Sequence, residues 1–162
     1  KSDPKIGVVQ LEDAIHGALL LTRGRLDEGG IELIRRGDAD VKVRADRFRL
    51  EQVIVNLVKN AAEALEGRPG ARLILAVEHD ADRVRLIVAD NGPGVPAEKR
   101  GRVLERFYRL DESRTKPGSG LGLSLVQAIA RVHGGELVLE DAGPGLRVAL
   151  DIPAESPDPQ AH

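Results

Sequence analysis

The most regular pattern in the sequence is an apolar stripe at helical spacing over residues 46–65. Apolar side chains recur there every three or four positions, at Leu50, Val53, Ile54, Leu57, Val58, Ala61 and Leu65. Asp46 is suited to cap the start of a helix, and Gly67 and Pro69 are suited to end it. The segment therefore predicts a helix with one apolar face, which needs a second layer to cover it.

Two stretches of alternating apolar and polar side chains follow this helix, over residues 72–79 and 83–89. The turn residues Asp80-Ala81-Asp82 join them, so they predict an antiparallel pair of strands. The same patterns predict further elements in this order: a helix over 11–26, two short strands over 31–35 and 41–44 around a turn at Gly37-Asp38, a helix over 121–132, and strands over 136–140 and 146–152.

This order places hairpin-like strand pairs between helices and lacks the strict strand-helix alternation of a parallel sheet. It predicts an α+β fold, a two-layer α/β sandwich with three main helices on one face of a mixed, mainly antiparallel sheet. We expect residues 1–10 to be a linker and residues 11–152 to be the folded domain. Residues 153–162 are rich in proline and are expected to be a disordered tail.

Composition excludes several kinds of function. The formal net charge of −2 provides no positive field for nucleic acid or anionic lipid. The chain has no Cys, which excludes disulfides and thiolate chemistry, and its one Tyr and two Phe are too few for base stacking. No apolar run reaches the roughly 20 residues of a membrane helix. We therefore expect a cytoplasmic domain that contacts neither nucleic acid nor membrane, although other segments of a longer protein could anchor it.

The regular pattern stops between residues 95 and 117. This stretch is rich in charge, poor in apolar residues, and longer than an ordinary connection. We interpret it as a lid whose cations reach phosphate oxygens, and the alternative is a solvated loop. Its basic and aromatic residues include Arg106, Phe107, Tyr108, Arg109, Arg114 and Lys116.

The helix over 46–65 carries two amides opposite its apolar stripe. At about 100° per residue, Asn56 and Asn60 project about 40° apart. Asn competes with the helix backbone for hydrogen bonds, so two of them within a helix indicate that their amides have a use. Because amide oxygens suit Mg²⁺, a metal site is one hypothesis, and a solvated helix face is the other.

Two glycine-rich segments are further candidates. In 90–94, Asp90-Asn91-Gly92-Pro93-Gly94 ends a predicted strand. A buried Asp there needs a donor such as a purine amine, and glycines let a flat ring approach the backbone; a simple turn is the alternative. In 118–122, Gly118-Ser119-Gly120-Leu121-Gly122 opens the helix over 121–132, where free N–H groups favour phosphate. This segment is neither a Walker P-loop nor a dinucleotide fingerprint.

In order and spacing, the runs EQVIVNLVKNAAEAL, DNGPGV, ERFYRLDESR and GSGLGLSLV together resemble the catalytic and ATP-binding domain of bacterial sensor histidine kinases. The resemblance extends over residues 11–152. This family belongs to the superfamily shared with DNA gyrase, the mismatch-repair ATPase and the heat-shock chaperone ATPase. It implies the Bergerat-type ATP-binding fold, with a nucleotide pocket beneath a flexible lid and with ATP and Mg²⁺ as cofactors.

The resemblance also implies roles for single residues. Asn60 would coordinate Mg²⁺, with Asn56 beside it near the phosphates. Asp90 would accept a hydrogen bond from the adenine amino group, and Gly92 and Gly94 would shape the adenine pocket. Phe107, Tyr108 and Arg109 match the lid motif, in which Leu110 stands where a second Phe often occurs. The motif that wraps the triphosphate would comprise Gly118, Gly120, Leu121 and Gly122.

One difference favours a kinase over the hydrolases of the superfamily. Those hydrolases carry a Glu base four residues before the metal-binding Asn, and this chain has Asn56 there, which cannot accept a proton from water. Glu51 projects to the opposite side of the helix from Asn60, at about 180°, and is discounted, whereas Glu63 is close enough to matter. We expect Asn56, Asn60 and Arg109 to serve transfer of the ATP γ-phosphate to a histidine.

The expected partner is a histidine-bearing dimerisation and phosphotransfer module of the same protein, with a response regulator contacted indirectly. The surroundings of His16 do not resemble the acceptor motif, so the acceptor is expected outside this chain, and the isolated domain is expected to be monomeric. Two alternatives remain: an ATPase of the gyrase or chaperone type, and a non-catalytic nucleotide-sensing module.

Overall fold

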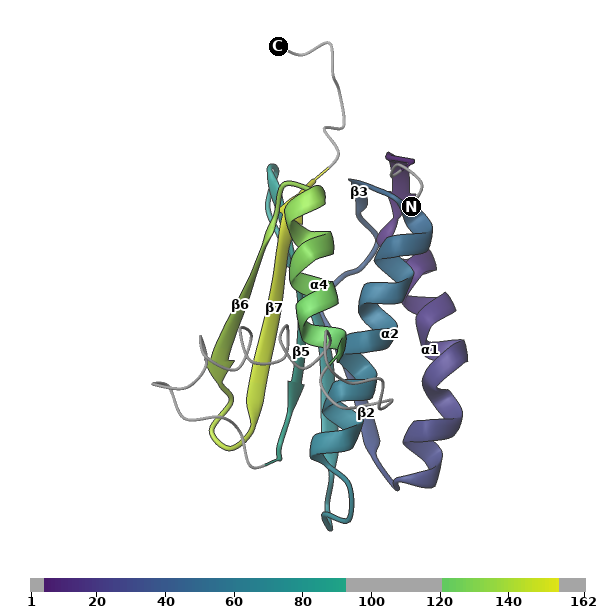
Figure 1. Cartoon of the computed structure of the whole chain (residues 1–162), viewed down its shortest axis with the longest axis vertical. Helices are drawn as coiled ribbons and strands as arrows, with labels where there is room; N and C mark the ends of the chain where they lie inside the picture. The colour runs from purple at the N-terminus through teal and green to yellow at the C-terminus, as the bar shows by residue number, and fades with distance from the viewer. Residues whose placement is uncertain (1–4, 93–120, 155–162) are drawn as a thin grey trace.

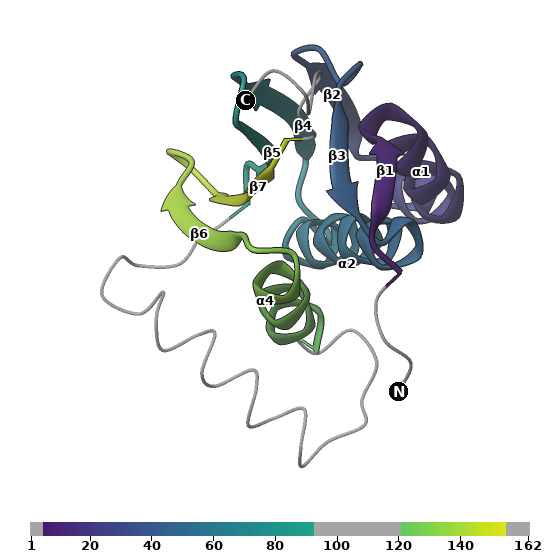
Figure 2. The ribbon, with the colours of Figure 1, turned by 90° about the horizontal axis from the view of Figure 1, so that it is seen from above.

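Helices cover one face of a five-stranded sheet in the computed structural model, which describes residues 5–92 and 121–154 (Figures 1 and 2). The helices are α1 (Leu11–Glu28), α2 (Arg47–Ala64) and α4 (Leu121–Val132). The strands are β1 (Gly7–Gln10), β2 (Glu32–Arg36), β3 (Lys42–Ala45), β4 (Arg72–His79), β5 (Arg83–Asp90), β6 (Glu136–Asp141) and β7 (Leu146–Pro153). The predicted two-layer architecture is thereby confirmed.

The large sheet is mixed, as predicted. Its strand order is β2-β4-β5-β7-β6, in which β2 runs parallel to β4 and every other neighbouring pair is antiparallel. Strands β1 and β3 form a separate two-stranded sheet, which lies near the N-terminus at one end of the helical layer (Figure 1). A single bridge between Val43 and Ala154 links this small sheet to the end of β7.

The prediction that residues 31–35 and 41–44 pair as a hairpin is wrong. Both strands exist, but β2 pairs with β4 and β3 pairs with β1. The Asp38 carboxylate accepts a hydrogen bond from the Asp40 N–H, and this local turn sends the chain away from β2. Alternation of side chains identifies a strand without identifying its partner. The expected linker over 1–10 likewise contains β1.

The apolar stripe of α2 packs into the core as its spacing predicts. Val53, Ile54 and Val58 are completely buried, and they face the helix side of the sheet together with Leu73 and Leu86. Side chains alternate along β5, so that Val84, Leu86 and Val88 belong to this main core while Ile87 and Ala89 belong to a separate cluster on the helix-free face. The position of Asp90 after Val88 therefore places its side chain on the helix side.

A group of buried polar residues joins the start of α2 to the end of α4. The Asp46 carboxylate caps α2 by accepting from the Arg49 N–H at 3.1 Å, and it also accepts from the Lys5 N–H at 2.8 Å. The hydrogen bond from Lys5 is the main reason that the pKa of Asp46 lies below its ordinary value. The buried His133 ring accepts from the Asp46 N–H at 3.0 Å and bonds the Ile129 carbonyl at 2.8 Å. This Asp46 hub is fully satisfied.

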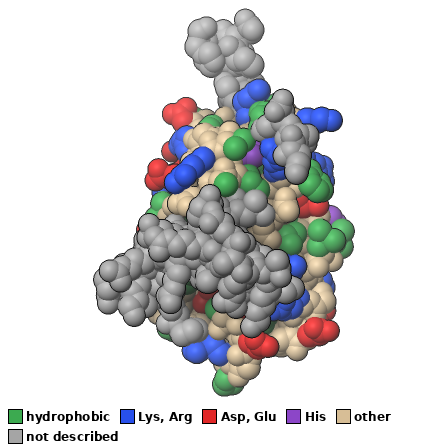
Figure 3. All heavy atoms as spheres, viewed as in Figure 1, with side chains coloured by type: hydrophobic (Ala, Val, Ile, Leu, Met, Phe, Trp, Pro, Cys, Tyr) green, Lys and Arg blue, Asp and Glu red, His purple; other side chains and the backbone are tan. Residues whose placement is uncertain are grey.

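Charged side chains of both signs are interspersed on the face shown in Figure 3. No helix in the described ranges is both long enough and apolar enough to cross a membrane.

We predict that His133→Leu destabilises the domain by about 1–3 kcal/mol, because it leaves the buried Asp46 N–H without an acceptor. Urea unfolding followed by circular dichroism measures the difference. Arg131→Ala, an exposed change two residues earlier, serves as the control and should stay within about 0.5 kcal/mol of the native protein. Equal stability of His133→Leu and the native protein would show that the hub contributes nothing.

Candidate functional site

Asn60 and Asp90 line one small cavity between α2 and the strands β5 and β7. The cavity has a volume of about 50 Å³, and its other lining side chains are apolar. The lining residues are Leu57, Asn60, Ala61, Ala64, Val88, Asp90, Leu146 and Val148. Pockets that enclose drug-sized ligands measure roughly 300–1,000 Å³, so this cavity is too small to enclose such a ligand by itself.

Asp90 is a buried carboxylate with one oxygen satisfied. Its exposed fraction is 6%. Oδ1 accepts from the Gly92 N–H at 2.8 Å and from the Leu146 N–H at 3.4 Å. Oδ2 accepts no hydrogen bond from the described residues. Burial raises the pKa of Asp90, and the two backbone hydrogen bonds oppose this shift only in part. The carboxylate therefore offers a free acceptor in an apolar setting.

Two glycines allow the backbone to close around Asp90. A Cβ atom at Gly92 would lie 3.0 Å from both the Ala64 carbonyl oxygen and Asp90 Oδ1. A Cβ atom at Gly145 would overlap the Asp90 carbonyl, and Gly145 has a φ of +107°, which favours glycine. The end of α2 and the β6–β7 turn thus both approach the end of β5.

Sequence reasoning missed Gly145 and Leu146 as parts of this site. The segment 142–145 has the composition of an ordinary hairpin turn, and nothing in its letters indicates contact with a residue more than fifty positions earlier. Only the register of β7 beside β5 brings Leu146 to Asp90.

Asn60 presents an unsatisfied amide to the same cavity. Its Nδ2 atom is buried and has no hydrogen-bond partner among residues 5–92 and 121–154. Such an orphaned group costs stability unless a ligand or ion pairs with the amide. Rotation of the amide by half a turn exchanges Nδ2 with Oδ1, which is an oxygen of the kind that Mg²⁺ binds. Asn56 lies one turn earlier on α2 and is half-buried.

The carboxylates of α2 lie away from this cavity. The Glu51 carboxylate packs against Gly17 of α1, close enough to fill the space of a missing Cβ. Burial raises the pKa of Glu63, and the charge of Arg25 on α1 lowers it in part. Neither Glu lines the cavity. The described residues also contain no cluster of three or more His, Asp or Glu side chains suited to hold a metal.

The remaining predicted site residues are not placed beside Asp90 and Asn60 by the structure. Leu121 and Gly122 are the first residues of α4, as the sequence predicts. The others lie outside the described residues: Gly94, Tyr108, Arg109, Gly118 and Gly120.

Comparisons with known proteins show which family this chain is similar to. Residues 45–156 match the family described as histidine kinase-, DNA gyrase B-, and HSP90-like ATPase. The signal transduction histidine-protein kinase/phosphatase MprB of Mycolicibacterium smegmatis is 38% identical over 166 aligned positions, which cover 94% of this chain and 32% of that protein. The chain spans about a third of the length of this relative.

Solved structures agree with this match. The catalytic domain of histidine kinase ThkA superposes with a TM-score of 0.79 at 28% identity, covering 92% of this chain and 97% of that one. A mycobacterial sensor histidine kinase MprB superposes with a TM-score of 0.76 at 30% identity, covering 93% and 99%. The chain therefore belongs to the family of histidine kinase-, DNA gyrase B- and HSP90-like ATPases, in which it is the ATP-binding catalytic domain of a sensor histidine kinase.

Proposed function

We propose that this domain binds ATP with Mg²⁺ at the Asp90–Asn60 site and transfers the γ-phosphoryl group to a histidine on a separate module. The observation that carries the proposal is the buried Asn60 amide nitrogen without a hydrogen-bond partner, in the same apolar cavity that Asp90 lines. Buried polar groups without partners are uncommon in folded proteins, so this amide, beside a carboxylate whose Oδ2 accepts no hydrogen bond from the described residues, supports a ligand that completes the site.

Asp90 is suited to recognise the adenine amino group. Its Oδ1 is held by two backbone N–H groups, which leaves Oδ2 as an acceptor fixed in position. An amino group that donates to a buried carboxylate forms a charge-assisted hydrogen bond, stronger than a neutral one. Gly92 lies directly after β5, where a Cβ atom would crowd Asp90 Oδ1 and the Ala64 carbonyl, so a glycine at this position keeps the carboxylate in place.

Asn60 is suited to hold Mg²⁺ through its amide oxygen, together with phosphate oxygens and water. Mg²⁺ commonly uses one or two protein ligands in phosphate-transfer sites, so a single Asn on α2 fits this chemistry. When bound there, the ion would neutralise phosphate charge. Asn56, one turn nearer the start of α2, would donate from its amide to phosphate oxygens.

The proposed transfer needs no protein base. The lone pair of a neutral imidazole nitrogen attacks the γ-phosphorus, a P–N bond forms, and the bond from the γ-phosphorus to the bridging oxygen of ADP breaks. The imidazolium then loses the proton on its other nitrogen to water. The chain contributes position and charge.

The module that carries the histidine is proposed from the relatives. They are about three times the length of this chain and are named histidine-protein kinase/phosphatase. One structural neighbour is histidine kinase ThkA in complex with the response regulator protein TrrA. By this analogy the chain acts on a histidine of its own longer protein, in the cytoplasm, and reaches a response regulator through it.

The second candidate function is ATP hydrolysis of the gyrase or chaperone type. The position one turn before Asn60 holds Asn56, and the structure turns Glu51 toward α1. Neither arrangement provides a carboxylate base for water, which favours phosphotransfer over hydrolysis.

We predict that Asp90→Asn weakens ATP binding by about 10- to 100-fold, measured by calorimetric titration. The Asn Oδ1 atom keeps both backbone hydrogen bonds, and its amino group then faces the adenine amino group as a second donor. Asp38→Asn, an exposed change outside the site, is the matched control. Unchanged affinity of Asp90→Asn would overturn the assignment.

We make a second prediction for Asp90→Asn, which concerns how the stability of the domain depends on pH. Because burial raises the pKa of Asp90 in the folded state, its contribution to stability is complete below about pH 4 and declines as pH rises through the folded pKa. Without nucleotide, Asp90→Asn should therefore gain stability relative to the native protein between about pH 4 and pH 7.5, as urea midpoints would show. A relative loss over this range would mean that the ionised carboxylate stabilises the fold.

Asn60→Ala should remove the Mg²⁺ dependence of ATP binding, so that calorimetric affinities with and without Mg²⁺ become equal. Gln52→Ala, on an exposed position of α2, should keep the native dependence. If Asn60→Ala keeps it as well, Asn60 is not the metal ligand.

A further inference from the structure

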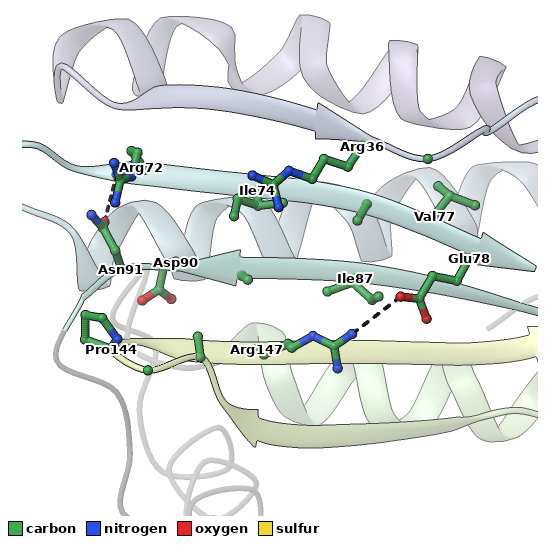
Figure 4. Close-up of a pocket in the computed structure, with 15 residues that line it drawn as sticks. Arg36, Arg72, Ile74, Val77, Glu78, Ile87, Asp90, Asn91, Pro144 and Arg147 are labelled. Atoms are coloured by element: carbon green, nitrogen blue, oxygen red, sulfur yellow. Dashed lines mark hydrogen bonds and ion pairs between the residues drawn. The ribbon is translucent and has the colours of Figure 1, made fainter.

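The helix-free face of the sheet carries a second and larger groove (Figure 4). Its volume is about 580 Å³, which falls in the range of small-molecule sites. Strands β4 and β5 form its floor, the end of β2 forms one wall, and the β6–β7 turn at Pro144 forms the opposite wall. The histidine kinase function proposed above makes no use of this groove.

The floor of the groove is apolar where a solvated sheet face is ordinarily polar. Antiparallel strands with one face in water alternate apolar and polar side chains. On the outward positions of β4 and β5, however, the chain has Ile74, Ala76, Ile87 and Ala89. Ile87 and Ala89 are buried in a cluster of their own, and Ile74 and Ala76 are partly exposed against it. The exposed part of this cluster is an apolar platform open to a ligand.

The far end of the groove is closed by paired charges. Arg147 forms an ion pair with Glu140 and lies 3.8 Å from the Glu78 carboxylate across the sheet (Figure 4). At the near end, Asn91 is also occupied: it accepts from the Arg72 N–H at 2.8 Å and donates to the Gly70 carbonyl at 2.9 Å. These groups line the ends of the groove. The charges of Arg147 and Glu78 are already paired, and the Asn91 amide already has its hydrogen-bond partners.

Two guanidinium groups at one edge of the groove differ from these paired groups. Arg36 and Arg72 lie on either side of Ile74 (Figure 4), and neither side chain forms a hydrogen bond or an ion pair with the described residues. Arg72 pairs in register with Glu32 on β2, and Arg36 is four residues beyond Glu32 on that neighbouring strand, so the Cα atoms of Arg36 and Arg72 are about 14 Å apart. Side chains of this length from two such positions can converge on a single anion.

We propose that this groove binds a small amphipathic anion. An aromatic or branched aliphatic body lies on the platform of Ile74 and Ala76, above the buried Ile87, and one carboxylate, sulfonate or phosphate group lies between Arg36 and Arg72. Charge complementarity carries the choice of an anion, because the only unpaired charges of the described lining, apart from the Asp90 carboxylate on the opposite side, are these two cations.

This ligand would not compete with a nucleotide. The side chains of Asp90 and Asn60 lie on the helix side of the sheet, whereas Arg36, Ile74 and Arg72 lie on the other side. Asp90 is the one described residue that lines both sites, and the β6–β7 turn residues Ala142, Gly143 and Pro144 line the groove and not the small cavity. The two ligands can therefore be bound together, which separates this proposal from the proposed function.

The test uses the anionic dye 1-anilinonaphthalene-8-sulfonate as the probe, with the 162-residue chain and fluorescence as the readout. We expect one saturable site per chain whose affinity is unchanged by saturating ATP. The uncharged analogue N-phenyl-1-naphthylamine should bind at least about tenfold more weakly, because it lacks the group that the two Arg side chains pair with. Displacement of the dye by ATP, or equal binding of the uncharged analogue, would overturn the proposal.

Variants make the test specific to the groove. Arg36→Ala combined with Arg72→Ala should weaken dye binding by about 10- to 100-fold. Arg23→Ala combined with Arg131→Ala removes the same charge from exposed helix positions and should leave the affinity unchanged. Ala76→Phe should fill the groove and abolish binding, and thermal unfolding checks that each variant folds. Equal affinity in the groove and control pairs, or no saturable binding by the native chain, would contradict the proposal.

Discussion

The buried carboxylate of Asp90 depends on two backbone N–H groups, one from the chain just after β5 and one from the start of β7. These donors hold Oδ1, and burial raises the pKa of the group because the charge has little solvent around it. The arrangement requires close approach of three chain segments, which Gly92 and Gly145 permit. Close packing at the end of β5 thus holds Oδ1 and leaves Oδ2 without a donor among the described residues.

Helix α2 connects two buried polar groups of opposite character. At its first turn, the Asp46 carboxylate accepts from the N–H groups of Lys5 and Arg49, and the His133 ring accepts from the Asp46 N–H. Near its last turn, Nδ2 of the Asn60 amide has no hydrogen-bond partner among the described residues. The helix has 18 residues and is about 27 Å long, so these ends are well separated. The satisfied end stabilises the helical layer, and the unsatisfied end loses stability that a ligand would restore.

Sequence patterns predicted the elements better than their pairing. The α2 stripe, the Asp46 cap and the β4–β5 pair follow from local spacing and turn chemistry, and the structure confirms them. The partners of β2 and β3 are set by non-local contacts that alternation does not encode. In the site, Asp90 and Asn60 could be predicted because a carboxylate at the end of an apolar strand and an amide within a helix are better suited to bind a ligand than to stabilise those elements. Gly145 and Arg36 could not be predicted, because only tertiary packing brings them to the site and to the groove.

The central claim is that Asp90 recognises an exocyclic amino group, and the most direct measurement is calorimetric titration of the native chain with ATP and with purine riboside 5′-triphosphate, which lacks that group. The account predicts saturable ATP binding with one nucleotide per chain and an affinity for the second nucleotide lower by about 10- to 100-fold. Equal affinities would contradict it, because they would show that the free oxygen of Asp90 has no part in choosing the base.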